Sequence, residues 1–109
     1  MPGWRWRHRW RRRGRPPAEL ILPSIPRANR FIPEPCLNPV PISITFAELE
    51  ALRLVYLERM TQRDAAKKMG TSRGTIWRLV KSGREKIIRA IVELRPIIII
   101  PGGELREEK

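Results

Sequence analysis

Residues 62–81 read QRDAAKKMGTSRGTIWRLVK, and the rest of the chain is best interpreted outward from this stretch. Ala66 comes four residues before Gly70, and Ile76 comes six residues after it. Alanine lets two helices cross closely, and glycine adopts the positive φ of a sharp turn without a Cβ clash. This spacing of small, turning and core-filling residues predicts a helix-turn-helix.

Two hydroxyl residues mark where the predicted helices begin. Thr61 caps the first helix and Ser72 the second, because a side-chain oxygen at this position accepts hydrogen bonds from free backbone N–H groups. Apolar residues at helical spacing predict the buried sides. These are Ala65, Ala66 and Met69 on the first helix, and Ile76, Leu79 and Val80 on the second.

The outer face of the second helix is basic and is predicted to read double-stranded DNA. In a helix-turn-helix the second helix enters the major groove with its N-terminal residues at the base edges. We expect Arg73 and Arg78 to contact guanine, because a guanidinium bonds O6 and N7 together, and Trp77 to contact a thymine methyl or a sugar. The predicted base contacts are Arg73, Gly74, Trp77, Arg78 and Lys81. The predicted phosphate contacts are Thr61, Gln62, Ser72, Thr75, Arg84 and Lys86.

Positive charge is concentrated around the same stretch. The formal net charge is +12; residues 59–89 hold ten Lys or Arg against two acids, and residues 1–15 hold seven Arg and no acid. This distribution suits a polyanion and predicts binding that weakens steeply with salt. An ordinary helical hairpin with a solvated basic face is the alternative, but the spaced small and apolar residues together with the charge favour DNA binding.

Residues 45–80, TFAELEALRLVYLERMTQRDAAKKMGTSRGTIWRLV, resemble the core of a family of small prokaryotic proteins regarded as predicted DNA-binding proteins, whose helix-turn-helix is similar to region four of sigma factors. An upstream basic start and Phe-x-Pro element are matched by Arg30, Phe31 and Pro33, so the resemblance spans about residues 27–92. This sequence departs from the family pattern at four positions. Arg59 stands where the family tends to have a helix-ending glycine, Thr71 where a small aliphatic residue is usual, and Gly74 where proline often opens the second helix. Cys36 also lies later than the cysteine expected in the upstream segment. The resemblance implies the fold and a DNA partner, and no further biochemical role.

Length and composition predict one domain with appendages. A chain of 109 residues forms one hydrophobic core, and the thin core of so small a helical part favours a homodimer. The predicted class is mainly α, with three to four helices. The predicted segments are 1–17, a disordered Arg/Trp-rich arm; 18–44, a Pro-rich extended segment; 45–94, the helix-turn-helix DNA-binding domain; and 95–109, a C-terminal strand and tail.

Helices are also predicted on both sides of the central stretch. Thr45 caps a helix from Phe46 to about Glu58, whose inward residues are Leu49, Leu52, Val55 and Leu57. The apolar series Val80, Gly83, Ile87, Ala90 and Leu94 predicts that the second helix runs on, or resumes after a kink at Ser82 and Gly83. Part of this series is expected to pair with a twin subunit, placing two reading helices about one DNA turn apart.

The proline-rich and C-terminal segments favour short strands. Prolines exclude helix over most of residues 16–41, where Glu19–Leu22 and Asn29–Ile32 are candidate extended pieces. Four isoleucines between Pro96 and Pro101 predict a strand that pairs with one of these pieces. An apolar tail folded over the helices is the alternative.

The arm, MPGWRWRHRWRRRGRPP, is predicted to be disordered because it has no apolar face large enough to offset the entropy of ordering it. Arg13, Gly14, Arg15 and Pro16 match the R-G-R-P core of the AT-hook, which enters the minor groove of A/T-rich DNA. A merely solvated basic tail is the alternative. Trp4, Trp6 and Trp10 alternate with arginine, which also fits an anionic membrane surface or stacking on unpaired bases.

The composition disfavours other classes of protein. Cys36 and His8 are the only residues of their kinds, so an internal disulfide or a zinc site cannot be assembled, and Cys36 is expected to be a small apolar filler. There are no paired carboxylates, no nucleophile with a base and no phosphate-cradling glycine loop, so we expect no enzyme, no cofactor and no small-molecule ligand. The longest apolar run, residues 97–100, is far below the roughly 20 residues that span a bilayer, and no signal peptide is visible. A cytoplasmic, nucleoid-associated protein is expected.

The sequence therefore predicts a sequence-specific DNA-binding protein, a transcriptional regulator. An architectural nucleoid or RNA-associated protein that binds through charge and the basic arm is the alternative. A recombinase with this motif as an accessory reader is disfavoured, because the chain has no room for a catalytic domain.

Overall fold

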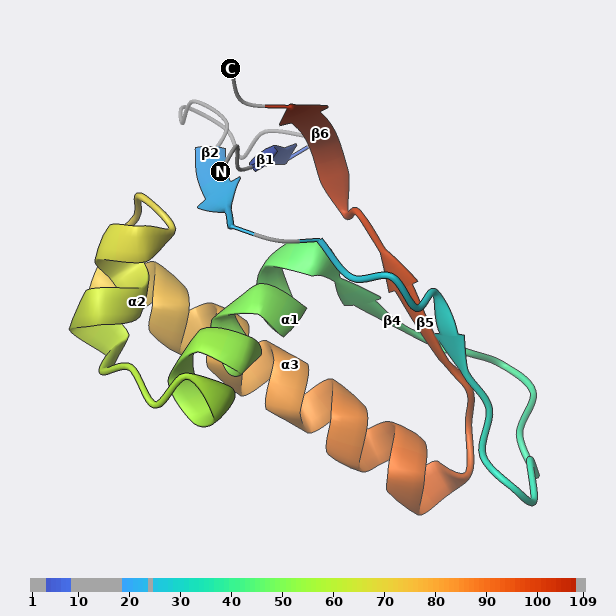
Figure 1. Cartoon of the computed structure of the whole chain (residues 1–109). Coiled ribbons are helices and arrows are strands. Elements are labelled where there is room, and N and C mark those ends of the chain that lie inside the picture. Colours follow the sequence, from blue (N-terminus) through green and yellow to red (C-terminus); the bar gives the residue numbers. More distant parts are fainter. Residues whose placement is uncertain (1–3, 9–18, 24, 108–109) are drawn as a thin grey trace, which may run out of the picture.

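Helices with two small sheets beside them make up the protein (Figure 1), as seen in a computed structural model that describes residues 4–8, 19–23 and 25–107. In chain order the elements are β1 (Trp4–His8), β2 (Glu19–Leu22), β3 (Arg30–Phe31), β4 (Ile42–Thr45), α1 (Phe46–Leu52), the π-helical turn η1 (Arg53–Leu57), α2 (Gln62–Lys68), α3 (Arg73–Glu93), β5 (Ile97–Ile100) and β6 (Gly103–Glu107). The expected mainly α class is confirmed in part, because two three-stranded sheets accompany the helices.

α1 begins where the sequence predicts, because Thr45 and Glu48 cap it reciprocally. The Thr45 hydroxyl accepts the Glu48 amide at 3.1 Å, and the Glu48 carboxylate accepts the Thr45 amide at 2.9 Å. The helix then widens into η1, whose last hydrogen bond spans five residues. This widening turns Leu54 fully inward and leaves Leu57 75% exposed. The expectation that Leu57 faces inward is wrong because it assumed α-helical spacing through a π-helical segment.

The turn between α2 and α3 has the predicted caps and the predicted glycine. Thr61 and Ser72 cap the two helices, since each hydroxyl accepts the amide three residues further on, at 3.1 and 3.2 Å. Gly70 has a φ of +66°. The amides of Gly70 and Thr71 donate to carbonyls in the last turn of α2 at 3.2 and 2.9 Å. The turn is therefore held by backbone hydrogen bonds as well as by glycine's conformational freedom.

One apolar core lies between β2 and the three helices. The inner residues predicted for α2 and α3 belong to it, with Leu79 partly buried at its edge. Its buried members are Leu20, Leu22, Ala47, Ala51, Leu52, Leu54, Ala65, Ala66, Met69, Ile76 and Val80. Because α2 and the first half of α3 pack on this core, their outer faces are rigidly presented to solvent.

α3 continues without interruption through Ser82 and Gly83, where a kink was one of the two expectations. Its inner side packs on α1 at Gly83, where a Cβ atom would lie only 2.7 Å from Leu52 Cδ1. Val80, Gly83 and Ala90 are buried on the inner side of the helix. The expectation that part of this series pairs with a second subunit stays a prediction, since Ile87 and Leu94 are only partly buried.

Glu48 links α1 to α3 from the inside of the protein. Its residue is only 4% exposed, and its carboxylate accepts hydrogen bonds from the hydroxyls of Thr45 and Ser82. It also pairs with the ammonium of Lys86 at 2.8 Å. A buried carboxylate needs such partners on both oxygens, so this network fixes how α3 lies against α1.

A mixed sheet in the order β3-β5-β4 runs beside the helices (Figure 1). Its central strand β5 confirms the strand predicted from the four isoleucines, and excludes the alternative of a tail folded over the helices. β5 pairs antiparallel with β3, which lies within the predicted piece Asn29–Ile32. It pairs in parallel with β4, with Ile42 opposite Ile97. The sequence did not predict β4, since its four residues directly follow a proline-rich segment.

A second sheet has β1 at its centre, between antiparallel β2 and β6. The expectation that residues 1–17 are disordered is therefore wrong for Trp4–His8. The alternation of Trp and Arg there has the two-residue period of a strand, and two partner strands supply the backbone hydrogen bonds. β2 has the predicted bounds and attaches this sheet to α2, because the Ile21 amide donates to the Met69 carbonyl at 2.9 Å. The AT-hook match, Arg13, Gly14, Arg15 and Pro16, lies outside the described residues.

Cys36 lies exposed in the loop that joins β3 to β4, and its thiol donates to the Asn38 carbonyl at 3.7 Å. The expectation that it fills apolar space is wrong. The amides of Leu37 and Asn38 donate to the Leu94 carbonyl at 3.2 and 3.3 Å, so the loop is held at the end of α3, outside the core.

Candidate nucleic-acid interface

The first two turns of α3 have one exposed side and one buried side. Ile76 and Val80 are 0% and 2% exposed on the inner side, which packs in the core. The residues predicted to contact bases are all exposed on the outer side: Arg73, Gly74, Trp77, Arg78 and Lys81. The structure therefore brings these residues together on the surface of one rigid helix.

Among the described residues, exposed cations without an ion-pair partner are concentrated on α2, the loops beside it and the first half of α3. Seven cations in this region are exposed, and none forms an ion pair with a residue that the structure describes. They are Arg59, Arg63, Lys67, Lys68, Arg73, Arg78 and Lys81. Further along α3, Arg89 pairs with Glu93 at 3.4 Å, and Lys86 pairs with Glu48. Such unpaired charge creates a positive potential that favours a polyanionic partner.

Arg53, in contrast, is neutralised within its own segment. Its guanidinium pairs with Glu50 at 2.8 Å and with Glu58 at 3.0 Å. Hydrogen bonding to Glu50 raises the pKa of Arg53 above its ordinary value, although partial burial acts in the opposite direction. This arginine therefore adds little to the positive surface of α2 and α3.

Four residues predicted to contact phosphates lie at the two helix starts. Thr61 and Gln62 begin α2, and Ser72 and Thr75 lie at the start of α3. The hydroxyls of Ser72 and Thr75 are 3.1 Å apart and hydrogen-bonded. Helix starts carry backbone N–H groups and a partial positive charge, which suit phosphate oxygens.

Arg84 adjoins the outer face of α3 through two contacts. Its guanidinium carbon lies 5.8 Å from the centre of the Trp77 ring, within the range of a cation–π contact. Its Nη1 donates to the Tyr56 hydroxyl at 3.0 Å. Arg84 is therefore held beside Trp77, next to the residues predicted to contact bases.

Lys86, the sixth residue predicted to contact phosphates, is directed elsewhere. Its ammonium is bound to the Glu48 carboxylate, whose side chain is 5% exposed. Since that contact stabilises a buried charge, a phosphate would have to compete with it. The structure therefore separates Lys86 from the other predicted contacts, and its charge serves the packing of α3 on α1.

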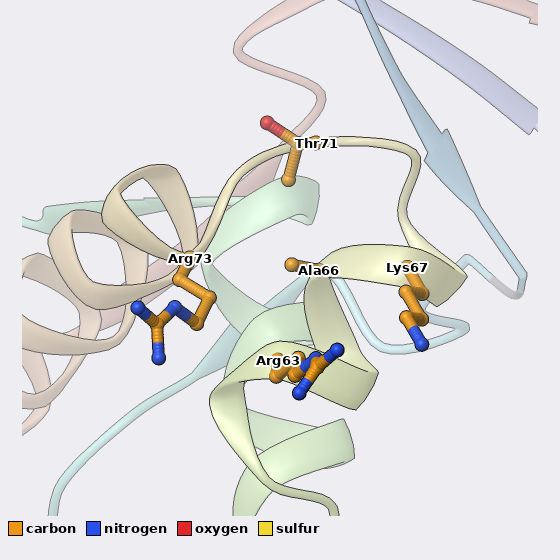
Figure 2. A pocket seen from close by; sticks show the side chains of 5 residues that line it. All are labelled: Arg63, Ala66, Lys67, Thr71 and Arg73. Carbon is orange, nitrogen blue, oxygen red and sulfur yellow. The ribbon is translucent and has the colours of Figure 1, made fainter.

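An open hollow of about 360 Å³ lies between α2 and the start of α3. It is lined by Arg63, Ala66, Lys67, Thr71 and Arg73. Figure 2 shows Arg73 extending from the start of α3, and Arg63 and Lys67 extending from α2. Sequence reasoning missed Arg63 and Lys67, although their spacing of four residues places both on one side of a helix.

Residues 8–108 match the family described as protein of unknown function DUF134. The chain belongs to this family. It is 46% identical over 100 residues to a UPF0251 protein of Archaeoglobus fulgidus, with 89% of this chain and 95% of that protein covered. UPF0251 proteins of Pyrococcus furiosus and Methanosarcina acetivorans are 47% and 38% identical over 98 residues, covering 87% and 88% of this chain and 90% and 88% of those proteins. No solved structure matches the chain.

The DUF134 match covers strands on both sides of the helices as well as the helices themselves. It reaches from the last residue of β1 through β6, so β2 to β6 belong to the family domain and are not an appendage of this chain. The names of the relatives state no ligand and no activity.

The described part of the chain contains no group of three or more His, Cys, Asp or Glu side chains arranged to hold a metal ion. None of its helices combines the length and the apolar character that crossing a membrane requires.

Proposed function

We propose that this DUF134 protein is a sequence-specific double-stranded DNA-binding protein, a transcriptional regulator that reads the major groove with the start of α3. The observation that carries the proposal is the exposed outer side of that helix, where Arg73, Arg78 and Lys81 have no ion-pair partner among the described residues. A helix fixed in the core on its inner side presents such side chains in a defined geometry, which base recognition requires.

The relation of α2 to α3 supports the same function. The two helices are joined by the short turn at Gly70, as in a helix-turn-helix. In that motif the first helix crosses the DNA backbone while the second lies in the major groove. The proposed phosphate contacts are therefore Thr61, Gln62, Ser72, Thr75 and Arg84, and Lys86 is not among them.

We also propose that the protein acts as a homodimer in the cytoplasm, associated with the nucleoid. An apolar groove of about 520 Å³ lies between η1 and the second half of α3, and includes Tyr56, Leu57 and Ile88. Leu57 and Ile88 are 75% and 59% exposed, and Ile91 and Val92 on the same helix are 61% and 74% exposed. Exposed apolar surface of this kind is typical of protein interfaces. A two-fold dimer would present two α3 helices to successive major grooves.

Selection of binding sites from a random duplex pool tests the proposal. We expect a defined sequence to be enriched, and Arg78→Ala to relax base preference at one position by about 1–3 kcal/mol. The matched control is Arg89→Ala, on the same helix but already paired with Glu93, which should leave the preference unchanged. Equal binding of all duplexes by the wild-type protein would contradict sequence-specific reading.

Binding to the same pool of duplexes also distinguishes sequence-specific reading from the alternative, an architectural protein that binds through charge alone. Deleting residues 1–15 would also remove β1, the central strand of its sheet. A loss of DNA affinity in that variant could therefore result from the missing arm or from a damaged fold. Replacing Arg13 and Arg15 by glutamine is the cleaner variant. If these two substitutions abolish binding while Arg78→Ala behaves as the loss of one phosphate contact, the architectural function is favoured.

A further inference from the structure

We propose that the hollow between α2 and α3 binds one phosphate of the DNA backbone, held by Arg63, Lys67 and Arg73. This inference rests on the proposed function and changes one part of it, because it moves Arg73 from base contact to phosphate contact. It also adds Arg63 and Lys67, which are not among the proposed base or phosphate contacts.

The floor of the hollow is small and fixed. Ala66 is 4% exposed and packs in the core, and the Thr71 amide donates to the Ala66 carbonyl at 2.9 Å. In Figure 2 the Thr71 methyl group points toward Ala66, while its hydroxyl points away. Two small apolar groups therefore leave the space open, and a rigid backbone turn sets the distance between α2 and the start of α3.

Three cations surround this floor. In Figure 2 the charged end of Arg63 lies below Ala66, with Arg73 on one flank and Lys67 on the other, and Thr71 lies on the opposite side. Each side chain is exposed, and none is paired with an acid in the part of the chain that the structure describes. Like charges gathered at one hollow repel one another, and an anion bound between them removes that repulsion.

A phosphodiester fits these groups better than a carboxylate does. Guanidinium groups bind phosphate oxygens through two parallel hydrogen bonds, and an ammonium adds a compact point charge. The space of about 360 Å³ leaves room for a phosphate with part of its hydration. It is also open to solvent, so a chain of linked nucleotides can pass over it.

The position of the hollow favours DNA over a free oxyanion. Arg73, the first residue of α3, lines it, so the hollow adjoins the outer side of α3 on which the other proposed base contacts lie. With α3 in the major groove, α2 crosses the adjoining backbone, and the hollow between them lies where a phosphate passes. Clamping this phosphate would set the depth and register of α3.

The test compares two double variants that remove the same charge. The hollow variant, Arg63→Gln with Lys67→Gln, removes two of the three positive charges that line the hollow. The control variant, Arg59→Gln with Lys68→Gln, removes two exposed positive charges outside it. Duplex affinity is measured by fluorescence anisotropy at several salt concentrations. We expect the hollow variant to reduce the slope of log affinity against log salt by about 0.9, the value for one phosphate, with its preference among sequences unchanged. The control should retain the wild-type slope.

Two results would overturn the clamp: a slope change as large in the control as in the hollow variant, or an altered base preference in the hollow variant. Arg73→Gln adds a direct check, since a base contact at Arg73 would relax preference at one position and a phosphate contact would not.

Titration of the free protein with small ligands distinguishes failure of the clamp from failure of the proposed function. The probes are inorganic pyrophosphate and the dinucleotide d(TpT), followed by amide chemical shifts. Shifts confined to residues 63–73 with d(TpT), and lost in the hollow variant, support a phosphodiester site even if no duplex sequence is preferred. Shifts with pyrophosphate alone would overturn the assignment to DNA, and no shift with either probe would overturn the site.

Discussion

Lys86→Met is expected to weaken the fold and leave DNA affinity intact, whereas Lys81→Met is expected to leave the fold intact and weaken DNA affinity. Both residues lie on α3, and both substitutions remove one positive charge. Lys81 is exposed without an ion-pair partner among the described residues, while Lys86 pairs with Glu48 at 2.8 Å. The contrast tests whether charge on this helix is divided between a binding half and a packing half.

The size of the stability loss follows from the burial of the two partners. Two unit charges 2.8 Å apart attract by about 6 kcal/mol at an effective dielectric constant of 20, before desolvation is subtracted. Breaking a fully buried pair costs about 3–5 kcal/mol, and an exposed pair is worth about 0.2–1 kcal/mol. Lys86 is 36% exposed and Glu48 5% exposed, and Glu48 keeps the donors from Thr45 and Ser82. We therefore expect Lys86→Met to lower the free energy of unfolding by about 1–3 kcal/mol.

Urea unfolding followed by circular dichroism measures this loss, and a double-mutant cycle with Glu48→Gln isolates the pair. The cycle should return a coupling energy of about 1 kcal/mol or more between Lys86 and Glu48, because the two groups are in contact. Duplex affinity is measured on both single variants under conditions in which each is fully folded. The reasoning is refuted if Lys86→Met unfolds within about 0.5 kcal/mol of wild type, or if it loses as much DNA affinity as Lys81→Met.

Three shorter predictions concern the turns and the second subunit. Arg59→Gly should be more stable than Arg59→Ala by about 0.5–1 kcal/mol, since only glycine relaxes a φ of +56°; equal urea midpoints would show that no strain is present. Gly70→Ala should lower the free energy of unfolding by about 1–2 kcal/mol because of its positive φ, and an unchanged thermal midpoint would contradict this. Ile88→Glu should keep the fold but shift sedimentation from dimer to monomer at micromolar concentration. A monomeric wild type, or a variant that stays dimeric, would reject this interface.

The helix starts and the central turn were predictable because their signals are local. A hydroxyl such as Thr45 or Ser72 accepts an amide only three residues away, so no distant part of the fold is needed to place it. Gly70 is similar, since its positive φ is a property of the turn itself. Strand β5 was also predictable, because proline-bounded isoleucines have few alternatives to a paired strand.

The errors arose where tertiary contacts override local composition. The Trp/Arg segment Trp4–His8 has the charge of a disordered tail, but β2 and β6 pair with it on both sides. Leu57 was misplaced because nothing in its neighbourhood distinguishes a π-helical turn from an α-helical one. Lys86 has the same residue type and helix as Lys81, and only the buried carboxylate of Glu48, 38 residues earlier, separates their roles.

The site shows the same division between local and distant signals. The outer side of α3 follows from its own sequence, since the residues opposite Ile76 and Val80 must face solvent once those two are buried. The hollow depends on where the turn at Gly70 places α3 relative to α2, which brings Arg73 near two residues that precede it by six and ten positions. Only the spacing of Arg63 and Lys67 was available as a signal in the sequence.

Cations in the first half of α3 have no acidic partner among the described residues, whereas Lys86 and Arg89 in the second half are paired. This difference implies that the salt dependence of DNA binding and the stability of the fold depend on different turns of one helix. Cations up to Lys81 have no acidic partner in the described part of the chain, so they can exchange counterions for DNA phosphates without weakening the fold. Beyond Ser82, Arg84 has no acidic partner among the residues that the structure describes, but Lys86 and Arg89 are paired with Glu48 and Glu93, and a partner that displaced these two cations would first have to break those pairs. Reversing the Arg89–Glu93 pair by exchanging the two residues should therefore leave the salt slope of DNA binding unchanged. A shifted slope would mean that α3 also contacts the backbone beyond Arg84.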